Sequence, residues 1–90
     1  MNSVLIIKKD NCIACDILES TIKYVIRNYY KDVKLKSIHI DDIDEEDRIK
    51  YISFGKFPIS VFARDNTVVE TLFGTQSKHK IFDALESLYW

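Results

Sequence analysis

The chain has 90 residues, of which 47% are hydrophobic, which is enough for one folded domain with a single core and is not typical of a disordered chain. The formal net charge is −1 and no block of basic residues stands out, so we expect no nucleic acid among the partners, because phosphate binding requires clustered cations. The longest apolar run, residues 4–7, is too short to span a membrane or to serve as an export signal, so we expect a cytoplasmic protein. We also expect a monomer.

Residues 4–7 lack polar alternation, which predicts a strand buried on both faces. Behind them, a helical spacing of apolar residues predicts a helix over about residues 14–30. A strand followed by a long helix indicates a βαβ crossover, with residues 33–40 as the returning strand. The apolar phase of this strand changes after Leu35, which predicts either a bulge near Lys36–Ser37 or burial of both faces. The apolar positions of the expected helix are Ile17, Leu18, Ile22, Val25, Ile26 and Tyr29.

An acidic stretch, residues 41–47, leads into a short expected helix with Asp44 as its N-cap. Gly55 is the expected end of that helix. Pro58 then opens a strand over residues 59–63, at the one position of a strand where proline is easily tolerated.

A polar turn at residues 64–67 and a strand at 68–73 complete an expected hairpin. Gly74 breaks the pattern, and Ser77 is the expected N-cap of a final amphipathic helix that extends to Tyr89. The order β-α-β-α-β-β-α predicts a single α/β domain with a central mixed sheet of four strands flanked by helices.

Cys12 and Cys15 are the only cysteines, and they lie where the first strand passes into the first helix. Two residues at positions i and i+3 of a helix have Cβ atoms about 5–6 Å apart, which is within reach of disulfide geometry. Cys12 is expected at or just before the first helical turn, where the unpaired N–H groups and the helix dipole stabilise a thiolate. We therefore expect Cys12 to be the attacking thiol and Cys15 the resolving thiol of a reversible couple. Lys8 and Lys9 add positive potential nearby, while Asp10 opposes it.

Other chemistry for the pair is less well supported. A CxxC pair can be half of a zinc site, but the remaining candidate ligands, His39 and His79, lack zinc-finger spacing. Inert packing cysteines are a further alternative. We expect no metal, with His39 on the sheet surface and His79 solvated at a helix start.

Four features resemble the thioredoxin/glutaredoxin superfamily: a buried strand, CxxC at the start of the first helix, a strand opened by Phe57-Pro58, and a glycine before the last helix. The resemblance covers nearly the whole chain and implies a thioredoxin-like fold and thiol–disulfide exchange. It also implies that Pro58 is a cis proline beside the cysteines and that Phe57 presents its backbone to substrate.

The branch of the superfamily is left open by the motifs. Thioredoxins typically carry Trp-Cys-Gly-Pro-Cys and an acid on the preceding strand, whereas here Asn11 precedes Cys12 and the first strand has no acid. Lys9 matches the glutaredoxin lysine that pairs with a glutathione carboxylate. The glutaredoxin segments Thr-Val-Pro and Gly-Gly-x-Asp are replaced by Lys56-Phe57-Pro58 and Gly74-Thr75-Gln76-Ser77.

We therefore predict a thiol–disulfide oxidoreductase with Cys12 and Cys15 as catalytic residues and Phe57, Pro58 and Lys9 as substrate-binding residues. No bound cofactor is expected. Disulfide-containing proteins are the expected substrates, and a thioredoxin reductase-like enzyme or glutathione is the expected electron donor. The alternatives are a glutathione-dependent glutaredoxin, a non-catalytic thioredoxin-fold binding module, and a metal or iron–sulfur carrier.

Overall fold

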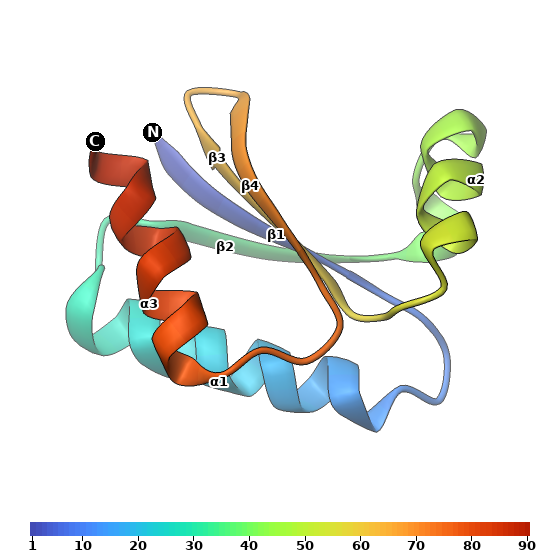
Figure 1. Cartoon of the computed structure of the whole chain (residues 1–90), viewed down its shortest axis with the longest axis horizontal. Helices are drawn as coiled ribbons and strands as arrows, with labels where there is room; N and C mark the ends of the chain where they lie inside the picture. Colours follow the sequence, from blue (N-terminus) through green and yellow to red (C-terminus); the bar gives the residue numbers. More distant parts are fainter.

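In the computed structural model, which describes residues 1–90, four strands form one sheet and three α-helices flank it (Figure 1). The spatial order of the strands is β2-β1-β3-β4. β1 pairs with β2 in parallel and with β3 in antiparallel orientation, and β3–β4 is an antiparallel hairpin, so the sheet is mixed as predicted. The strands are β1 (Asn2–Lys8), β2 (Lys34–His39), β3 (Ile59–Arg64) and β4 (Thr67–Phe73). The helices are α1 (Ile13–Tyr29), α2 (Glu45–Phe54) and α3 (Lys78–Glu86), with 3-10 turns at Ile40–Asp42 and Ser87–Tyr89.

The sheet separates two apolar clusters of unequal size. Helices α1 and α3 cover one face and α2 lies on the other side (Figure 1). Because successive side chains of a strand point to opposite faces, Val4 and Ile6 of β1 join the larger cluster under α1 and α3, while Ile7 joins the smaller one near α2. Both faces of the central strand are therefore buried, which confirms the prediction from its apolar run.

The change of apolar phase in β2 is explained by burial of both of its faces, the second of the two predicted causes. Val33 and Leu35 pack in the cluster under α1, whereas Ile38 and Ile40 pack in the cluster on the opposite face. The β1–β2 register runs without a shift, so the predicted bulge near Lys36–Ser37 is wrong. The sheet does contain an irregularity, but it lies in the hairpin, between Phe62 and Ala63 of β3.

Helix α1 has the predicted length, with both ends within one residue of the prediction. Its buried face consists of Cys15, Leu18, Ile22, Val25 and Ile26. Ile17 and Tyr29 were expected on this face but are 58% and 61% exposed, so that part of the prediction is wrong. Each helical residue is rotated by about 100° from the next, which turns Ile17 out of the stripe centred on Leu18 and Ile22.

The other two helices begin and end close to the predicted residues. Asp44 occupies the N-cap position of α2, although its side chain makes no capping hydrogen bond. Gly55 ends α2 in the left-handed conformation, with φ 68°. Ser77 caps α3 by accepting a hydrogen bond from the backbone N–H of Lys80 at 3.2 Å. The expected helix to Tyr89 is instead α3 followed by a 3-10 turn. No helix combines the length and apolar character needed to cross a membrane.

Candidate active site

The two cysteines occupy different positions in the first turn of α1. Cys12 is the N-cap residue, with extended backbone angles, and its Sγ accepts a hydrogen bond from the backbone N–H of Cys15 at 3.0 Å. A sulfur at this position satisfies one of the free N–H groups of the helix start, and the same donor would stabilise a thiolate there. This is the location that the sequence predicts for Cys12.

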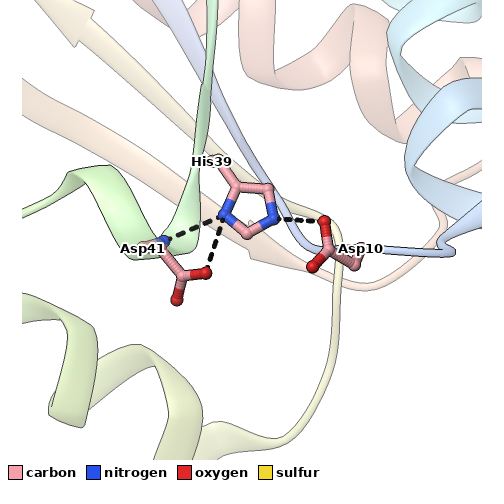
Figure 2. A group of neighbouring side chains, drawn as sticks. All are labelled: Asp10, His39 and Asp41. Atoms are coloured by element: carbon pink, nitrogen blue, oxygen red, sulfur yellow. Dashed lines mark hydrogen bonds and ion pairs between the residues drawn. The ribbon is translucent and has the colours of Figure 1, made fainter.

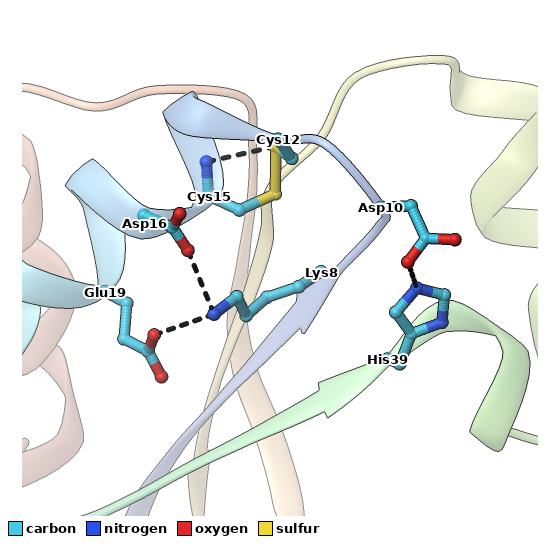
Figure 3. The surroundings of a disulfide bond; sticks show 7 residues. All are labelled: Lys8, Asp10, Cys12, Cys15, Asp16, Glu19 and His39. Carbon is cyan, nitrogen blue, oxygen red and sulfur yellow. Dashed lines mark hydrogen bonds and ion pairs between the residues drawn. A yellow bond between two sulfur atoms is a disulfide. The ribbon is translucent and has the colours of Figure 1, made fainter.

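Cys12 and Cys15 form a disulfide, with their Cα atoms 5.2 Å apart (Figure 3). That separation lies within the usual range for such bonds. The two sulfurs differ in access: Cys15 is fully buried on the inner face of α1, whereas Cys12 is partly exposed. A thiolate arriving from solution can therefore reach the Cys12 sulfur but not the Cys15 sulfur.

Pro58 and the cysteines are brought to one end of the sheet by strand pairing. Ile59, which follows Pro58, pairs with Ile7 near the end of β1, and the chain then passes through the β1–α1 loop to Cys12. The Phe57–Pro58 bond is cis, as the resemblance implies. Pro58 is buried, and its carbonyl oxygen accepts a hydrogen bond from the backbone N–H of Gly74 at 2.7 Å.

Lys9 and Phe57, both expected to bind substrate, lie close to each other. The Lys9 ammonium is 5.6 Å from the centroid of the Phe57 ring, a cation–π contact between the β1–α1 loop and the segment before β3. Phe57 also packs against the smaller apolar cluster. The two predicted residues therefore contact each other, and Lys9 lies three positions before Cys12.

Lys8 has a specific environment that the sequence analysis missed. Its Nζ lies 2.9 Å from a carboxylate oxygen of Glu19 and 3.2 Å from one of Asp16, both on α1 (Figure 3). The hydrogen bonds that the Lys8 ammonium donates to these carboxylates raise the pKa of Lys8, and the bond to Glu19 contributes more than the bond to Asp16. The hydrogen bond from Lys8, followed by one from Ser37, lowers the pKa of Glu19.

His39, expected as a plain sheet-surface residue, connects two segments through both of its ring nitrogens (Figure 2). Its Nδ1 accepts a hydrogen bond from the backbone N–H of Asp41 at 3.1 Å. That bond leaves the proton of the neutral ring on Nε2, which lies 2.9 Å from Oδ1 of Asp10 and donates to it. The ligand atoms of Asp10, His39 and Asp41 lie within 4.8 Å of one another, but these hydrogen bonds already account for their arrangement.

An open hollow of about 530 Å³ lies beside Cys12. Its lining is mostly charged or polar, and Cys12 contributes to it while the buried Cys15 does not. A second hollow of about 520 Å³ lies along α1 toward its C-terminal end and contains neither cysteine, so it is not part of this site. The residues around the first hollow are Lys8, Lys9, Asp10, Asn11, Cys12, Ile13 and Asp16.

Comparison with solved structures identifies the architecture. No family model and no curated protein matches the sequence. The oxidised mitochondrial thioredoxin 3 of Saccharomyces cerevisiae superposes with a TM-score of 0.74 at 17% identity, covering 97% of this chain and 78% of that one. The oxidised thioredoxin O2 of Arabidopsis thaliana gives 0.73 at 19% identity, covering 100% and 76%. A mutant thioredoxin of Halobacterium salinarum gives 0.73 at 21% identity, covering 97% and 74%. At these identities the similarity defines the fold, and the chain has the thioredoxin fold with a CxxC pair at the start of α1.

Proposed function

We propose that this protein is a thiol–disulfide oxidoreductase that reduces or exchanges disulfides of other proteins through Cys12 and Cys15. The observation that carries the proposal is the unequal access of the two sulfurs, with Cys12 partly exposed at the N-cap of α1 and Cys15 buried one turn deeper. In such an arrangement the accessible thiol attacks the substrate disulfide, and the buried thiol resolves the mixed disulfide in the second step.

The proposed cycle conserves electrons and protons. The Cys12 thiolate attacks a substrate disulfide, so that a Cys12–substrate S–S bond forms and one substrate thiolate leaves. Cys15 then loses its proton to solvent and attacks the Cys12 sulfur, forming the Cys12–Cys15 bond and releasing the second substrate thiolate. Both released thiolates are protonated from solvent. The protein has then lost two electrons, which an external dithiol or two monothiols must restore.

The substrate chain is proposed to bind in extended form beside Pro58. The neighbouring residue Phe57 offers backbone groups outside a regular strand, and its ring contacts the Lys9 ammonium. An extended segment that pairs with this backbone would bring its disulfide toward Cys12.

The electron donor and the location in the cell are further parts of the proposal. A thioredoxin reductase-like enzyme or glutathione would restore the dithiol, in the cytoplasm, and no bound cofactor would take part. Lys9 is the one residue that favours the glutaredoxin alternative. That alternative has the weaker support, because the compared structures named above are thioredoxins.

Reduction of insulin coupled to dithiothreitol tests the proposal. The wild-type protein should accelerate insulin precipitation, and both Cys12→Ser and Cys15→Ser should lose nearly all of that acceleration. With a substrate disulfide, Cys15→Ser should accumulate a mixed disulfide at Cys12, whereas Cys12→Ser should not. Full activity of Cys12→Ser would refute the assigned roles. If the wild-type pair stays fully oxidised or fully reduced at every ratio of reduced to oxidised glutathione, the protein is instead a non-catalytic binding module.

A further inference from the structure

Lys8 occupies a position that the strand pattern reserves for an apolar side chain. Val4 and Ile6 of β1 point toward α1 and are buried in the larger cluster. Lys8 is the third member of the same row, so its side chain also extends toward α1, under the turn that carries Cys12 and Cys15 (Figure 3). Its side chain is only 26% exposed. A charged side chain therefore takes the next position in the row of apolar side chains, at the edge of the core.

Two carboxylates hold the Lys8 ammonium near the first turn of α1, where the two cysteines lie. Asp16 directly follows Cys15, and Glu19 lies one helical turn further on. Their oxygens are 3.2 and 2.9 Å from Lys8 Nζ. Lys8 and Asp16 also line the hollow that contains Cys12. Both observations, the lining of the hollow and the two ion pairs, place Lys8 in the immediate surroundings of the disulfide.

We propose that Lys8 is a positioning residue of the redox pair, and that its charge, held in place by Asp16 and Glu19, stabilises the Cys12 thiolate and so favours the reduced state. This inference rests on the proposed function, because it concerns the same couple. Reduction consumes two electrons and two protons: the Cys12–Cys15 bond breaks, two external thiols join as their disulfide, and the two protein thiols form. Where the Cys12 thiol ionises, its proton passes to solvent.

The charges around the pair give the direction of the effect. The disulfide is neutral, whereas the reduced form carries a negative charge when Cys12 is ionised. Lys8, Asp16 and Glu19 together carry a formal charge of −1, so removing Lys8 leaves −2 beside the sulfurs and removing the Asp16 charge leaves none. The other charged and titratable groups around this end of the sheet are Lys9, Asp10, His39 with its neighbour Asp41, and Lys23, which acts on Glu19.

The test is the equilibrium of the couple with reduced and oxidised glutathione at pH 7. Lys8→Met should lower the equilibrium constant for reduction about tenfold, which corresponds to a potential about 30 mV more negative. Asp16→Asn should change it in the opposite direction, and Lys8→Arg should stay near wild type. Lys34→Met is the matched control, since it removes an exposed lysine at the opposite end of the β1–β2 pair. It should leave the equilibrium unchanged.

The rate of Cys12 alkylation by iodoacetamide as a function of pH gives a second readout that a merely structural role would not move. The midpoint of this profile should rise in Lys8→Met and fall in Asp16→Asn. Asp16 is 73% exposed, so its variant can decide the question even where Lys8→Met does not fold.

Equal equilibria and equal alkylation profiles in wild type, Asp16→Asn and any folded Lys8→Met would overturn this inference while leaving the proposed function intact. A wild-type pair that does not exchange with glutathione or dithiothreitol would overturn the proposed function itself.

Discussion

The imidazole of His39 donates a hydrogen bond to Asp10 over 2.9 Å, although the two residues are 29 positions apart. Asp10 lies in the loop between β1 and α1, two residues before Cys12, and His39 ends β2. The second ring nitrogen accepts the backbone N–H of Asp41. One side chain thus connects the loop that precedes Cys12 to the neighbouring strand.

Removing the hydrogen bond between Asp10 and His39 should increase the mobility of the loop while changing the overall stability only slightly. We expect His39→Ala to increase amide hydrogen exchange several-fold at Cys15 and Asp16, whose N–H groups donate to Cys12 at the end of the loop. The same variant should lower the free energy of unfolding by about 1 kcal/mol or less, because the pair is exposed. Hydrogen exchange followed by NMR, together with urea denaturation, measures both effects.

His39→Asn separates the two contacts of the ring. An asparagine oxygen can still accept the Asp41 N–H, but the shorter side chain cannot reach Asp10. Exchange at Cys15 and Asp16 should therefore rise as in His39→Ala, while the turn at Ile40–Asp42 keeps its protection. Unchanged exchange at these two amides in both variants would show that Asp10 and His39 do not restrain the loop.

The Lys8–Glu19 pair should make stability depend on pH at the acid end. The pKa of Glu19 is lowered from its usual 4.5 and that of Lys8 is raised from 10.5, so the unfolded chain binds a proton at Glu19 before the folded one does. The contribution of Glu19 is therefore present above about pH 4.5 and is lost as the pH falls through its folded pKa. That of Lys8 is present below its unfolded pKa and is lost at strongly alkaline pH.

Glu19→Gln should accordingly lower the free energy of unfolding of the oxidised protein at pH 7 by about 1 kcal/mol or less, as for other partly exposed pairs. Near pH 2 the variant and the wild type should converge. Glu46→Gln, on the exposed face of α2, serves as the control and should not give this pattern. A Glu19→Gln deficit that is the same at both pH values would contradict the ion-pair explanation.

Lys9 should affect reactions with anionic partners more than reactions with neutral ones. Its ammonium is exposed beside the site and close to Phe57, so it attracts negative charge from solution. We expect Lys9→Met to slow the reaction of the dithiol with oxidised glutathione about threefold at low salt, and less at high salt. The reaction with neutral hydroxyethyl disulfide should change little. Equal slowing with both disulfides would assign Lys9 a role other than electrostatic attraction.

Two isoleucines of α1 should differ sharply in what they contribute to stability. Ile22 is fully buried in the larger cluster, whereas Ile17 is 58% exposed. Ile22→Ala should therefore lower the free energy of unfolding by about 2–5 kcal/mol, and Ile17→Ala by about 0.5 kcal/mol or less. Urea denaturation of the two oxidised variants tests this difference. Similar losses would mean that the buried face of α1 has been assigned incorrectly.

The order of the elements and the location of the cysteines could be predicted because both depend on local signals. Periodicity located α1, and the N-cap position of Cys12 followed from where the periodic pattern begins. The residue type and position of Ser77 likewise predict that it is the N-cap of α3. These signals act within a few residues, so the sequence contains them directly.

The remaining features depend on contacts between segments that are far apart in the sequence. Spacing along the chain does not indicate that Lys8 meets Glu19 or that Asp10 meets His39, because those contacts require the register of β1 with β2 and the placement of α1 on the sheet. Periodicity also could not decide how wide the buried stripe of α1 is, which explains the wrong assignment of Ile17. The alternation Val4, Ile6, Lys8 was the one signal that could have identified the lysine under α1.

The contrast between α1 and α2 bears on the proposed binding of substrate beside Pro58. Helix α1 buries five residues, whereas α2 buries none and reaches the smaller cluster mainly through Tyr51. Segments with little buried apolar surface open at low energetic cost, so amide exchange should be much faster in α2 than in α1. The chain from α2 leads through Phe57 to Pro58. A substrate bound beside Pro58, as proposed, would then contact a segment that can adapt to its shape, while α1 holds Cys12 in a fixed place.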